Sequence, residues 1–232
     1  MALLRLFHMA VPGYGHSRAF RCLWLLEELQ ADDFDVCMLT PGQPYAPQMQ
    51  KLGGVHSHKI PTLHIGGQEI SDSGVISQVI AERYQKHHNL LGLPGERLEM
   101  LQWLGMAETA ITFRMPLLRK LMGNGEPMTD LQIEIINPMK QIFKENVANF
   151  ESHFEKRDSD YLLSSGFSIA DTMCGFSLHM GEFWELLDLN PVSSPRTLAY
   201  LRRLQSRVAF KTTESYADLA PGIYSRGCIP VA

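Results

Sequence analysis

Three short segments carry side chains suited to binding a charged ligand or to proton chemistry. His16-Ser17 lies at the expected start of a helix, Lys59-Ile60-Pro61 at the expected start of a strand, and Asp72-Ser73 where a strand ends and a helix begins. A serine or aspartate at a helix start can cap the free backbone N–H groups. The same N–H groups and the Ser73 hydroxyl can instead bind a carboxylate, while Asp72 can accept a hydrogen bond from an ammonium group.

The sequence offers little support for metal or nucleotide chemistry. His56-Ser57-His58 and His87-His88 have no cysteine or carboxylate at metal-ligand spacing, so we expect no metal site. Pro12-Gly13-Tyr14-Gly15 stops short of the G-x-G-x-x-G fingerprint, and the sequence has no P-loop. The cysteines lie far apart in the sequence and are expected to be reduced thiols; they are Cys22, Cys37, Cys174 and Cys228.

The composition is that of a globular protein with a sizeable core. The 232 residues are 45% hydrophobic and 20% charged, with a formal net charge of -4, which argues against disorder and against a basic nucleic-acid scaffold. The longest apolar stretches, such as Ala19–Leu26, are shorter than the roughly 18 residues of a membrane span. The first residues lack the pattern of a signal peptide. We therefore expect a cytoplasmic protein with no membrane span and no nucleic-acid partner.

The elements that must position these residues change in type along the chain. The first third alternates β-type and helical patterns in the order β-α-β, a linking segment, then β-β-α. The expected strands and helices are Leu3–Met9, a helix from His16 to about Gln30, Phe34–Thr40, the hairpin of Lys59–Ile65 and Gln68–Ile70, and a helix from Ser73 to about Lys86.

From about Glu96 onward, apolar residues recur three and four positions apart, which predicts long amphipathic helices. We expect three parts: a small α/β domain over residues 1–86, a linker over 87–95, and an all-helical domain over 96–232. Within the last part, Ser168 and Asp171 have the spacing of a capping box, which predicts the start of a buried helix at Ile169.

Four motifs in this order resemble the glutathione S-transferase superfamily, in its cytosolic type. They are the first-helix segment His16–Leu29, the Ile-Pro strand start at Lys59–Leu63, the acidic-Ser pair Asp72-Ser73, and the helix-capping segment Phe167–Asp171. The Ser-Arg-x-x-Arg-x-x-Trp-Leu-Leu pattern from Ser17 is closest to a fungal and bacterial subgroup. The resemblance implies an α/β plus all-α fold, with a thioredoxin-like N-terminal domain (βαβ-ββα) followed by an all-helical C-terminal domain.

The resemblance also implies glutathione as co-substrate, without a metal. Ile60-Pro61 would then be a cis peptide whose Ile60 backbone pairs with the ligand, and Lys59 would bind the glycyl carboxylate. Ser73 would bind the γ-glutamyl carboxylate and Asp72 the ammonium group. From the residues alone, Pro61 is equally a proline that begins a strand, Lys59 a solvated lysine, and Asp72-Ser73 a helix cap.

A transferase of this kind needs a side chain that donates a hydrogen bond to the glutathione thiolate. Ser17 is the first choice by register with the subgroup, with an N-cap as its structural alternative; His16, as a neutral donor, and Tyr14 are the other candidates. The segment Val11–His16 contains no cysteine, which argues against a redox-cysteine reductase. Cys22, within the helix, is expected to be a packed thiol.

The resemblance implies a homodimeric glutathione S-transferase that detoxifies small, mostly apolar electrophiles. The alternatives are a glutathione-dependent disulfide reductase or peroxidase, and a non-catalytic regulatory module. The electrophile is expected to bind between the domains, against a helix that carries Trp103, Met106, Thr109 and Phe113.

Overall fold

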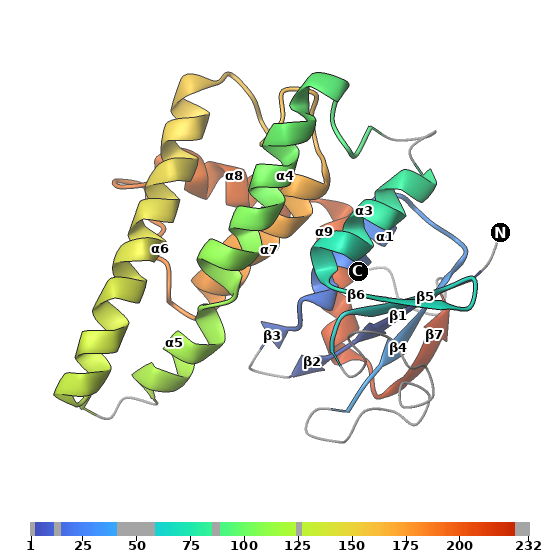
Figure 1. Cartoon of the computed structure of the whole chain (residues 1–232), viewed down its shortest axis with the longest axis horizontal. Coiled ribbons are helices and arrows are strands. Elements are labelled where there is room, and N and C mark those ends of the chain that lie inside the picture. The colour runs from blue at the N-terminus through green and yellow to red at the C-terminus, as the bar shows by residue number, and fades with distance from the viewer. Residues whose placement is uncertain (1–2, 12–14, 41–58, 85–88, 124–126, 226–232) are drawn as a thin grey trace. The chain divides into compact units, whose positions relative to one another are not determined.

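The computed structural model describes residues 3–11, 15–40, 59–84, 89–123 and 127–225. The chain divides into two compact units. One, the sheet unit, comprises Met1–Leu91 together with Gln205–Ala232, and the other, the helical unit, comprises Gly92–Leu204. Figure 1 shows the strands gathered in the first unit and the long helices α4, α6 and α7 in the second.

The sheet unit is built on a five-stranded mixed sheet with the strand order β6-β5-β1-β4-β7. Strands β1 and β4 are parallel, and the other neighbours are antiparallel. The strands are β1 Leu4–His8, β4 Phe34–Met38, β5 Thr62–Ile65, β6 Gln68–Ser71 and β7 Gly222–Ser225. A separate short pair is formed by β2 Ala10–Val11 and β3 Gly15–His16. The β-α-β and β-β-α order expected for the first third is confirmed over the described residues, with one correction. The pair β2–β3 was not expected, and His16 lies in β3 and not at the start of the helix, which begins at Ala19.

The described residues of this unit also form the α-helices α1 Ala19–Glu28, α3 Ser73–Tyr84 and α9 Val208–Ser215. Helix α1 contacts β1, α3 and α9, and it is buried along nearly its whole length. Its apolar side chains fill the core of the unit, where Phe20 and Trp24 pack edge-on against Phe210 of α9, with ring centroids 5.1 and 4.9 Å apart. The apolar spacing that predicted this helix is therefore core packing.

The last part of the chain belongs to the sheet unit, which differs from the expected all-helical domain over residues 96–232. Strand β7 pairs antiparallel with β4 at the edge of the sheet. Tyr216 is buried and its hydroxyl donates to Glu27 of α1 at 2.8 Å. These contacts join segments about 190 residues apart, and a four-residue edge strand has too few positions to show an alternating pattern.

The helical unit confirms the mostly helical character expected after residue 96. Its helices are α4 Arg97–Met106, α5 Met115–Met122, α6 Asp130–Lys156, α7 Ile169–Phe183 and α8 Pro195–Gln205. Helix α7 contacts α4 and is almost entirely buried. A π-helical segment, Ala107–Thr112, connects α4 and α5, and such segments often occur near functional sites.

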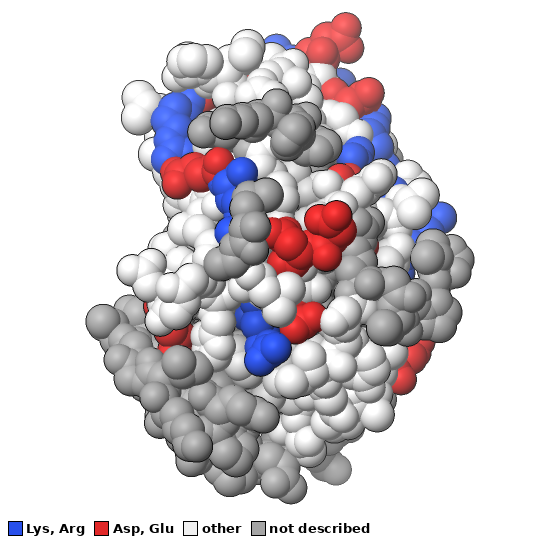
Figure 2. All heavy atoms as spheres, turned by 90° about the vertical axis from the view of Figure 1, so that its right-hand side faces the viewer, with Lys and Arg blue, Asp and Glu red and all other residues white. Residues whose placement is uncertain are grey.

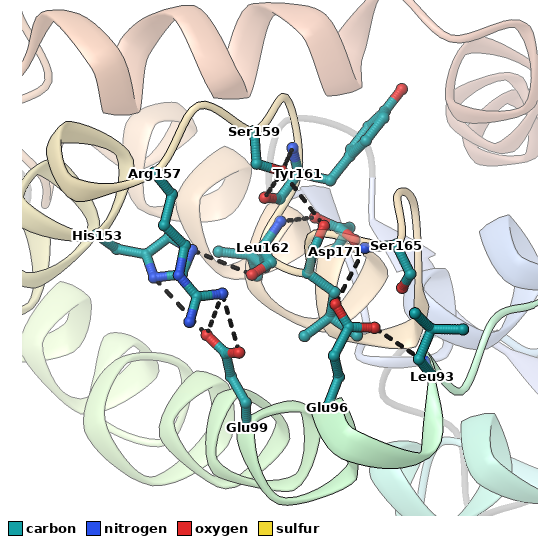
Figure 3. A network of polar contacts seen from close by, with 11 residues as sticks. Leu93, Glu96, Glu99, His153, Arg157, Ser159, Tyr161, Leu162, Ser165 and Asp171 are labelled. Carbon is teal, nitrogen blue, oxygen red and sulfur yellow. Dashed lines mark hydrogen bonds and ion pairs between the residues drawn. The ribbon is translucent and has the colours of Figure 1, made fainter.

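Asp171 holds the start of α7 as the capping box predicted. Its carboxylate accepts from the Ser168 backbone N–H at 2.8 Å, and the Ser168 hydroxyl accepts from the Ala170 N–H at 3.2 Å. The Leu162 N–H and the Tyr200 hydroxyl also donate to Asp171. Figure 3 shows Asp171 and Leu162 beside two further carboxylate clusters, centred on Glu96 and Glu99. The predicted cap is confirmed.

Two global features of the described residues bear on the expectations from composition. Among the described helices, none is long and apolar enough to cross a membrane. On the face drawn in Figure 2, basic and acidic side chains of the described residues are interspersed. The expected absence of a nucleic-acid partner stays a prediction.

Candidate functional site

The register of three strands brings the candidate glutathione-binding segments to one end of the sheet. Phe7 of β1 pairs with Thr62 of β5, and Thr62 pairs with Ser71 of β6. Pro61 immediately precedes Thr62 and Asp72 immediately follows Ser71, so both lie beside the carboxyl end of β1. Segments separated by many residues in the sequence thus meet at one end of the sheet.

Ser17 is held at the same end of β1. Its backbone N–H donates to the Met9 carbonyl at 2.9 Å. Its Oγ accepts from the backbone N–H groups of Met9 and Ala19, both at 3.4 Å. Helix α1 has Arg18 at its N-cap position and no side-chain cap hydrogen bond, so the N-cap role considered for Ser17 is wrong. Its hydroxyl still holds the segment that leads into the helix, so Ser17 has a structural role whatever its chemistry.

A fully buried histidine lies against Ser17. Nδ1 of His8 is 3.3 Å from Ser17 Oγ, and His8 is 0% exposed. Burial lowers the pKa of His8 to about 3, and the nearby His16 contributes to the shift. The His16 ring stacks on His8 with centroids 5.7 Å apart and also packs against the Phe20 ring, with centroids 4.7 Å apart. His8 is therefore a neutral imidazole at physiological pH.

The Ile60-Pro61 peptide bond is cis, as the resemblance implied. The Thr62 hydroxyl donates to the Lys59 carbonyl at 2.6 Å, which fixes the chain on both sides of the proline. Lys59 is exposed and Ile60 half-buried. A role of the Lys59 ammonium or the Ile60 backbone in ligand binding stays a prediction.

Asp72 has an unusual backbone conformation at the start of α3. Its φ is 77°, in the left-handed region, and Oδ1 accepts from the backbone N–H groups of Gly74 and Val75 at 2.9 and 3.1 Å. Asp72 thus caps α3, as its position in the sequence allowed. The residue is exposed, so its carboxylate is also accessible to a ligand. Such backbone outliers often mark functional sites.

Ser73, beside Asp72, contacts a buried arginine that the sequence analysis did not single out. Nη1 of Arg21 donates to Ser73 Oγ at 2.9 Å; Ser73 is 3% exposed and Arg21 is 0% exposed. Arg21 lies between Phe20 and Cys22 on a helix whose neighbouring side chains are all buried. A charged residue on the buried stripe of an amphipathic helix is the signal that could have identified it, because buried charges need partners.

Cys22 is the packed thiol that its position predicted. Its side chain is 0% exposed, and Sγ donates to the Ser73 carbonyl at 3.6 Å. Burial raises the pKa of this thiol to about 12, so it is not a thiolate near neutral pH. Cys37 and Cys174 are also buried. Cys228 lies outside the described residues.

The remaining candidates have different surroundings. Tyr14 lies outside the described residues, as do His56-Ser57-His58 and His87-His88. Trp103 is buried and stacks on Phe150 with centroids 5.0 Å apart. Phe113 is 71% exposed. Met106 is half-buried, and the exposed Thr109 donates through its hydroxyl to the Gly105 carbonyl. Their proposed role in a pocket stays a prediction.

A comparison with known families agrees with this arrangement. A family model of the glutathione S-transferase N-terminal domain matches residues 16–88, the range that contains Ser17, Pro61 and Ser73. Residues 16–88 therefore belong to the glutathione S-transferase N-terminal domain family. The resemblance seen in the sequence is thereby confirmed at the level of the superfamily. No curated protein sequence matches the chain significantly.

Solved structures of glutathione transferases match nearly the whole length of this chain in their fold. The glutathione S-transferase from Xylella fastidiosa matches 94% of this chain and 100% of its own, with 16% identity and a TM-score of 0.74. The glutathione transferase URE2P8 from Phanerochaete chrysosporium, crystallised with oxidized glutathione, matches 94% of this chain and 96% of its own, with 17% identity and a TM-score of 0.74. Ure2p5 from Phanerochaete chrysosporium, cocrystallised with 1-(S-glutathionyl)-2,4-dinitrobenzene, matches 94% and 96%, with 16% identity and a TM-score of 0.72. These likenesses establish the fold.

Proposed function

We propose that this protein is a glutathione transferase that activates the glutathione thiol for attack on small, mostly apolar electrophiles. The observation that carries the proposal is the location of Ser17, Pro61 and Ser73 at one end of the sheet, set by the register of β1, β5 and β6. A superfamily match over the same residues supports it. Glutathione is the co-substrate, and the chemistry needs no metal.

In the proposed complex, the charges of glutathione meet opposite charges and hydrogen-bond donors. The γ-glutamyl carboxylate accepts from the hydroxyl of Ser73 at the start of α3, and Asp72 accepts from the ammonium group. The backbone of Ile60, before Pro61, pairs with the extended peptide. Lys59 binds the glycyl carboxylate. The exposed Asp72 carboxylate and the Arg21 guanidinium against Ser73 support the first two contacts.

Activation of the thiol requires a modest stabilisation of its charged form. A thiol with a pKa near 8.5 is only ~3% ionised at pH 7, and lowering that pKa by two units takes ~2.7 kcal/mol. A helix N-terminus contributes ~0.3–1 kcal/mol, and a hydrogen bond to a charged group ~1.5–3 kcal/mol. One donor beside the start of α1 is therefore sufficient. Ser17 is the first choice, ahead of His16 and Tyr14.

In this proposal, residues of the helical unit bind the electrophile. Phe113 and Met106 give an aromatic ring and a flexible apolar side chain for substrates of varied shape, with Thr109 and Trp103 nearby in the sequence. The ligand of Ure2p5 is glutathione joined through sulfur to a nitroaryl ring, which makes aryl halides the first substrates to test. A detoxifying role, a cytoplasmic location and a homodimer belong to the same proposal.

The experiment that tests the proposal combines binding and turnover. Calorimetric titration with glutathione is followed by assays with an aryl halide, an epoxide, a peroxide and a disulfide. The Ser73→Ala protein should bind glutathione about tenfold to a hundredfold more weakly, the effect of losing a hydrogen bond to a charged group. Wild-type affinity in a folded Ser73→Ala protein would contradict the placement of the γ-glutamyl group.

The pattern of turnover separates the transferase from its alternatives. Conjugation of the aryl halide or epoxide supports the transferase. Turnover of the peroxide or disulfide alone would indicate a glutathione-dependent peroxidase or reductase. Glutathione binding with no turnover of any of the four substrates would indicate a non-catalytic regulatory module.

A further inference from the structure

Arg21 is a charged side chain in the interior of the sheet unit. It lies within the first turn of α1 and is 0% exposed. Its Nη1 donates a hydrogen bond to Oγ of Ser73, a residue that is itself only 3% exposed. Removing a guanidinium from water is costly unless it is paired and hydrogen-bonded. The contact therefore places a buried positive charge within hydrogen-bond distance of the Ser73 hydroxyl, at the start of α3.

The hydrogen-bonding capacity of the two groups determines where the serine proton points. A guanidinium has five donors and no acceptor, whereas a serine hydroxyl has one proton and two acceptor lone pairs. Arg21 therefore occupies a lone pair of Ser73 Oγ and cannot accept the serine proton. Among the described residues, Ser73 Oγ has no second hydrogen-bond partner in the structure. Its proton is left for an acceptor outside the protein.

The neighbouring groups limit which ligand this arrangement fits. Asp72 Oδ1 already accepts from the Gly74 and Val75 N–H groups, and the Ser73 hydroxyl remains as a donor for an anion. The Cys22 thiol, within reach of the charges of both Arg21 and Asp72, is neutral because burial raises its pKa to about 12. A positive charge behind Ser73 and a carboxylate at Asp72 match the carboxylate and ammonium of an α-amino acid group.

We propose that Arg21 is a positioning residue for an α-carboxylate bound at Ser73: it fixes the Ser73 hydroxyl as a donor and stabilises the bound anion through its buried charge. The inference rests on the proposed function, in which this α-carboxylate belongs to the γ-glutamyl group of glutathione. Arg21 acts through Ser73 and need not touch the ligand. It extends the binding site into the core of the sheet unit.

A purely structural role for Arg21 predicts a different result. Arg21 also connects α1 to α3 through Ser73, so its removal lowers stability in either case. If that connection were its only role, loss of Arg21 would weaken every glutathione-like ligand by the same factor. A positioning role predicts a loss confined to ligands that carry the α-carboxylate.

The test compares two ligands by calorimetry on folded protein. One is glutathione, and the other is 4-aminobutyryl-cysteinylglycine, which lacks only the α-carboxylate of the glutamyl group. Arg21→Met should weaken glutathione about tenfold to a hundredfold and the analogue less than threefold. Arg21→Lys keeps the charge and should recover part of the loss. Combining Arg21→Met with Ser73→Ala should add little to the effect of Ser73→Ala alone.

Cys22→Ala provides a matched control, because Cys22 is a buried neighbour in α1 that contacts the Ser73 carbonyl and not its hydroxyl. It should leave the ratio of the two affinities unchanged. If Arg21→Met does not fold, Arg21→Gln carries the same comparison, with the charge removed and a donor retained. Equal losses of affinity for both ligands would overturn this inference and leave the proposed function standing. A wild-type protein that binds neither ligand would instead refute the proposed function, and the inference with it.

Discussion

Ser17 Oγ lies 3.3 Å from Nδ1 of the fully buried His8. Both lone pairs of the Ser17 hydroxyl face backbone donors, the N–H groups of Met9 and Ala19, so its single proton is directed to His8. Nδ1 of His8 is then the acceptor, and the ring proton resides on Nε2. For Ser17 to stabilise a thiolate, its proton must turn from His8 to the sulfur.

The first prediction concerns the activating residue. Ser17→Ala should raise the pKa of bound glutathione by about one to two units, equivalent to ~1.4–2.7 kcal/mol. Turnover at pH 7 should fall roughly tenfold to a hundredfold, while glutathione affinity changes little, because the proposed binding groups lie at Ile60, Asp72 and Ser73. The ultraviolet absorbance of the thiolate, recorded across pH for the binary complex, measures the pKa.

His16→Ala and Tyr14→Phe are the parallel variants for this prediction. Ser17 also accepts backbone hydrogen bonds, so each variant is compared only after circular dichroism shows that it is folded. An unchanged thiolate pKa in Ser17→Ala, together with a raised pKa in one of the other two variants, would assign the role to that residue.

The second prediction is that His8 makes the protein sensitive to acid. Burial lowers the pKa of His8 from 6.5 to about 3, so the folded state binds fewer protons than the unfolded state between these values. The free energy of unfolding should therefore fall as the pH drops below about 6.5. Between pH 6.5 and 4.5 the contribution of His8 amounts to roughly 2–3 kcal/mol.

Urea unfolding of the wild type and His8→Gln at several pH values measures this contribution. The stability difference between the two proteins should shrink as the pH falls from 6.5 to 4.5. A difference that stays constant over this range would show that folding does not lower the pKa of His8.

The third prediction has the opposite sign and concerns Asp171. Burial raises the pKa of Asp171 from 3.8 to about 6, and hydrogen bonds from Leu162 and Tyr200 offset only part of the shift. The folded state thus binds more protons than the unfolded state between pH 3.8 and 6. The contribution of Asp171 to stability should decline by roughly 2–3 kcal/mol as the pH rises through this range.

Comparing the wild type with Asp171→Asn isolates that decline, because the amide does not titrate. Glu96, in the polar network of Figure 3, is the matched contrast. Burial acts to raise the pKa of Glu96, but hydrogen bonds from Ser165 and Leu93 outweigh it and the pKa is lowered, so its contribution is lost as the pH falls. The same pH trend for Asp171→Asn and Glu96→Gln, each relative to the wild type, would contradict this assignment.

The fourth prediction compares two bidentate Arg–Glu pairs that differ in burial. Arg207 donates through Nε and Nη2 to Glu28 at 2.5 and 2.7 Å, and 26% and 11% of these side chains are exposed. The corresponding values for Arg202 and Glu182 are 53% and 30%. Arg207→Met should lower the free energy of unfolding by about 2 kcal/mol, and Arg202→Met by less than about 1 kcal/mol.

Chemical denaturation of both variants measures the two losses. Glu28 also accepts from the Trp24 indole N–H at 2.9 Å, so removal of Arg207 leaves a mostly buried carboxylate with a weaker set of partners. Equal losses for the two variants, or a larger loss for Arg202→Met, would show that burial does not determine the strength of these pairs.

The sequence by itself determined the elements whose pattern is local. The apolar run of β1, the helical spacing in α1 and the Gly66-Gly67 turn between β5 and β6 each act within a few residues, so period and turn residues predicted them. The capping box of Ser168 and Asp171 is local for the same reason, since its partners are three positions apart. The superfamily resemblance rested on motifs of this kind.

Only the tertiary structure decided which side chains support the candidate site and where the end of the chain belongs. Arg21 and Ser73 are 52 positions apart, and β7 joins β4 from the far end of the sequence. Such contacts depend on how distant elements pack, and packing of this kind leaves no periodic signal in a single sequence. His8 shows the same limit: its place at the end of a buried strand was predictable, but its contact with Ser17 depends on how the segment after β1 returns to Met9.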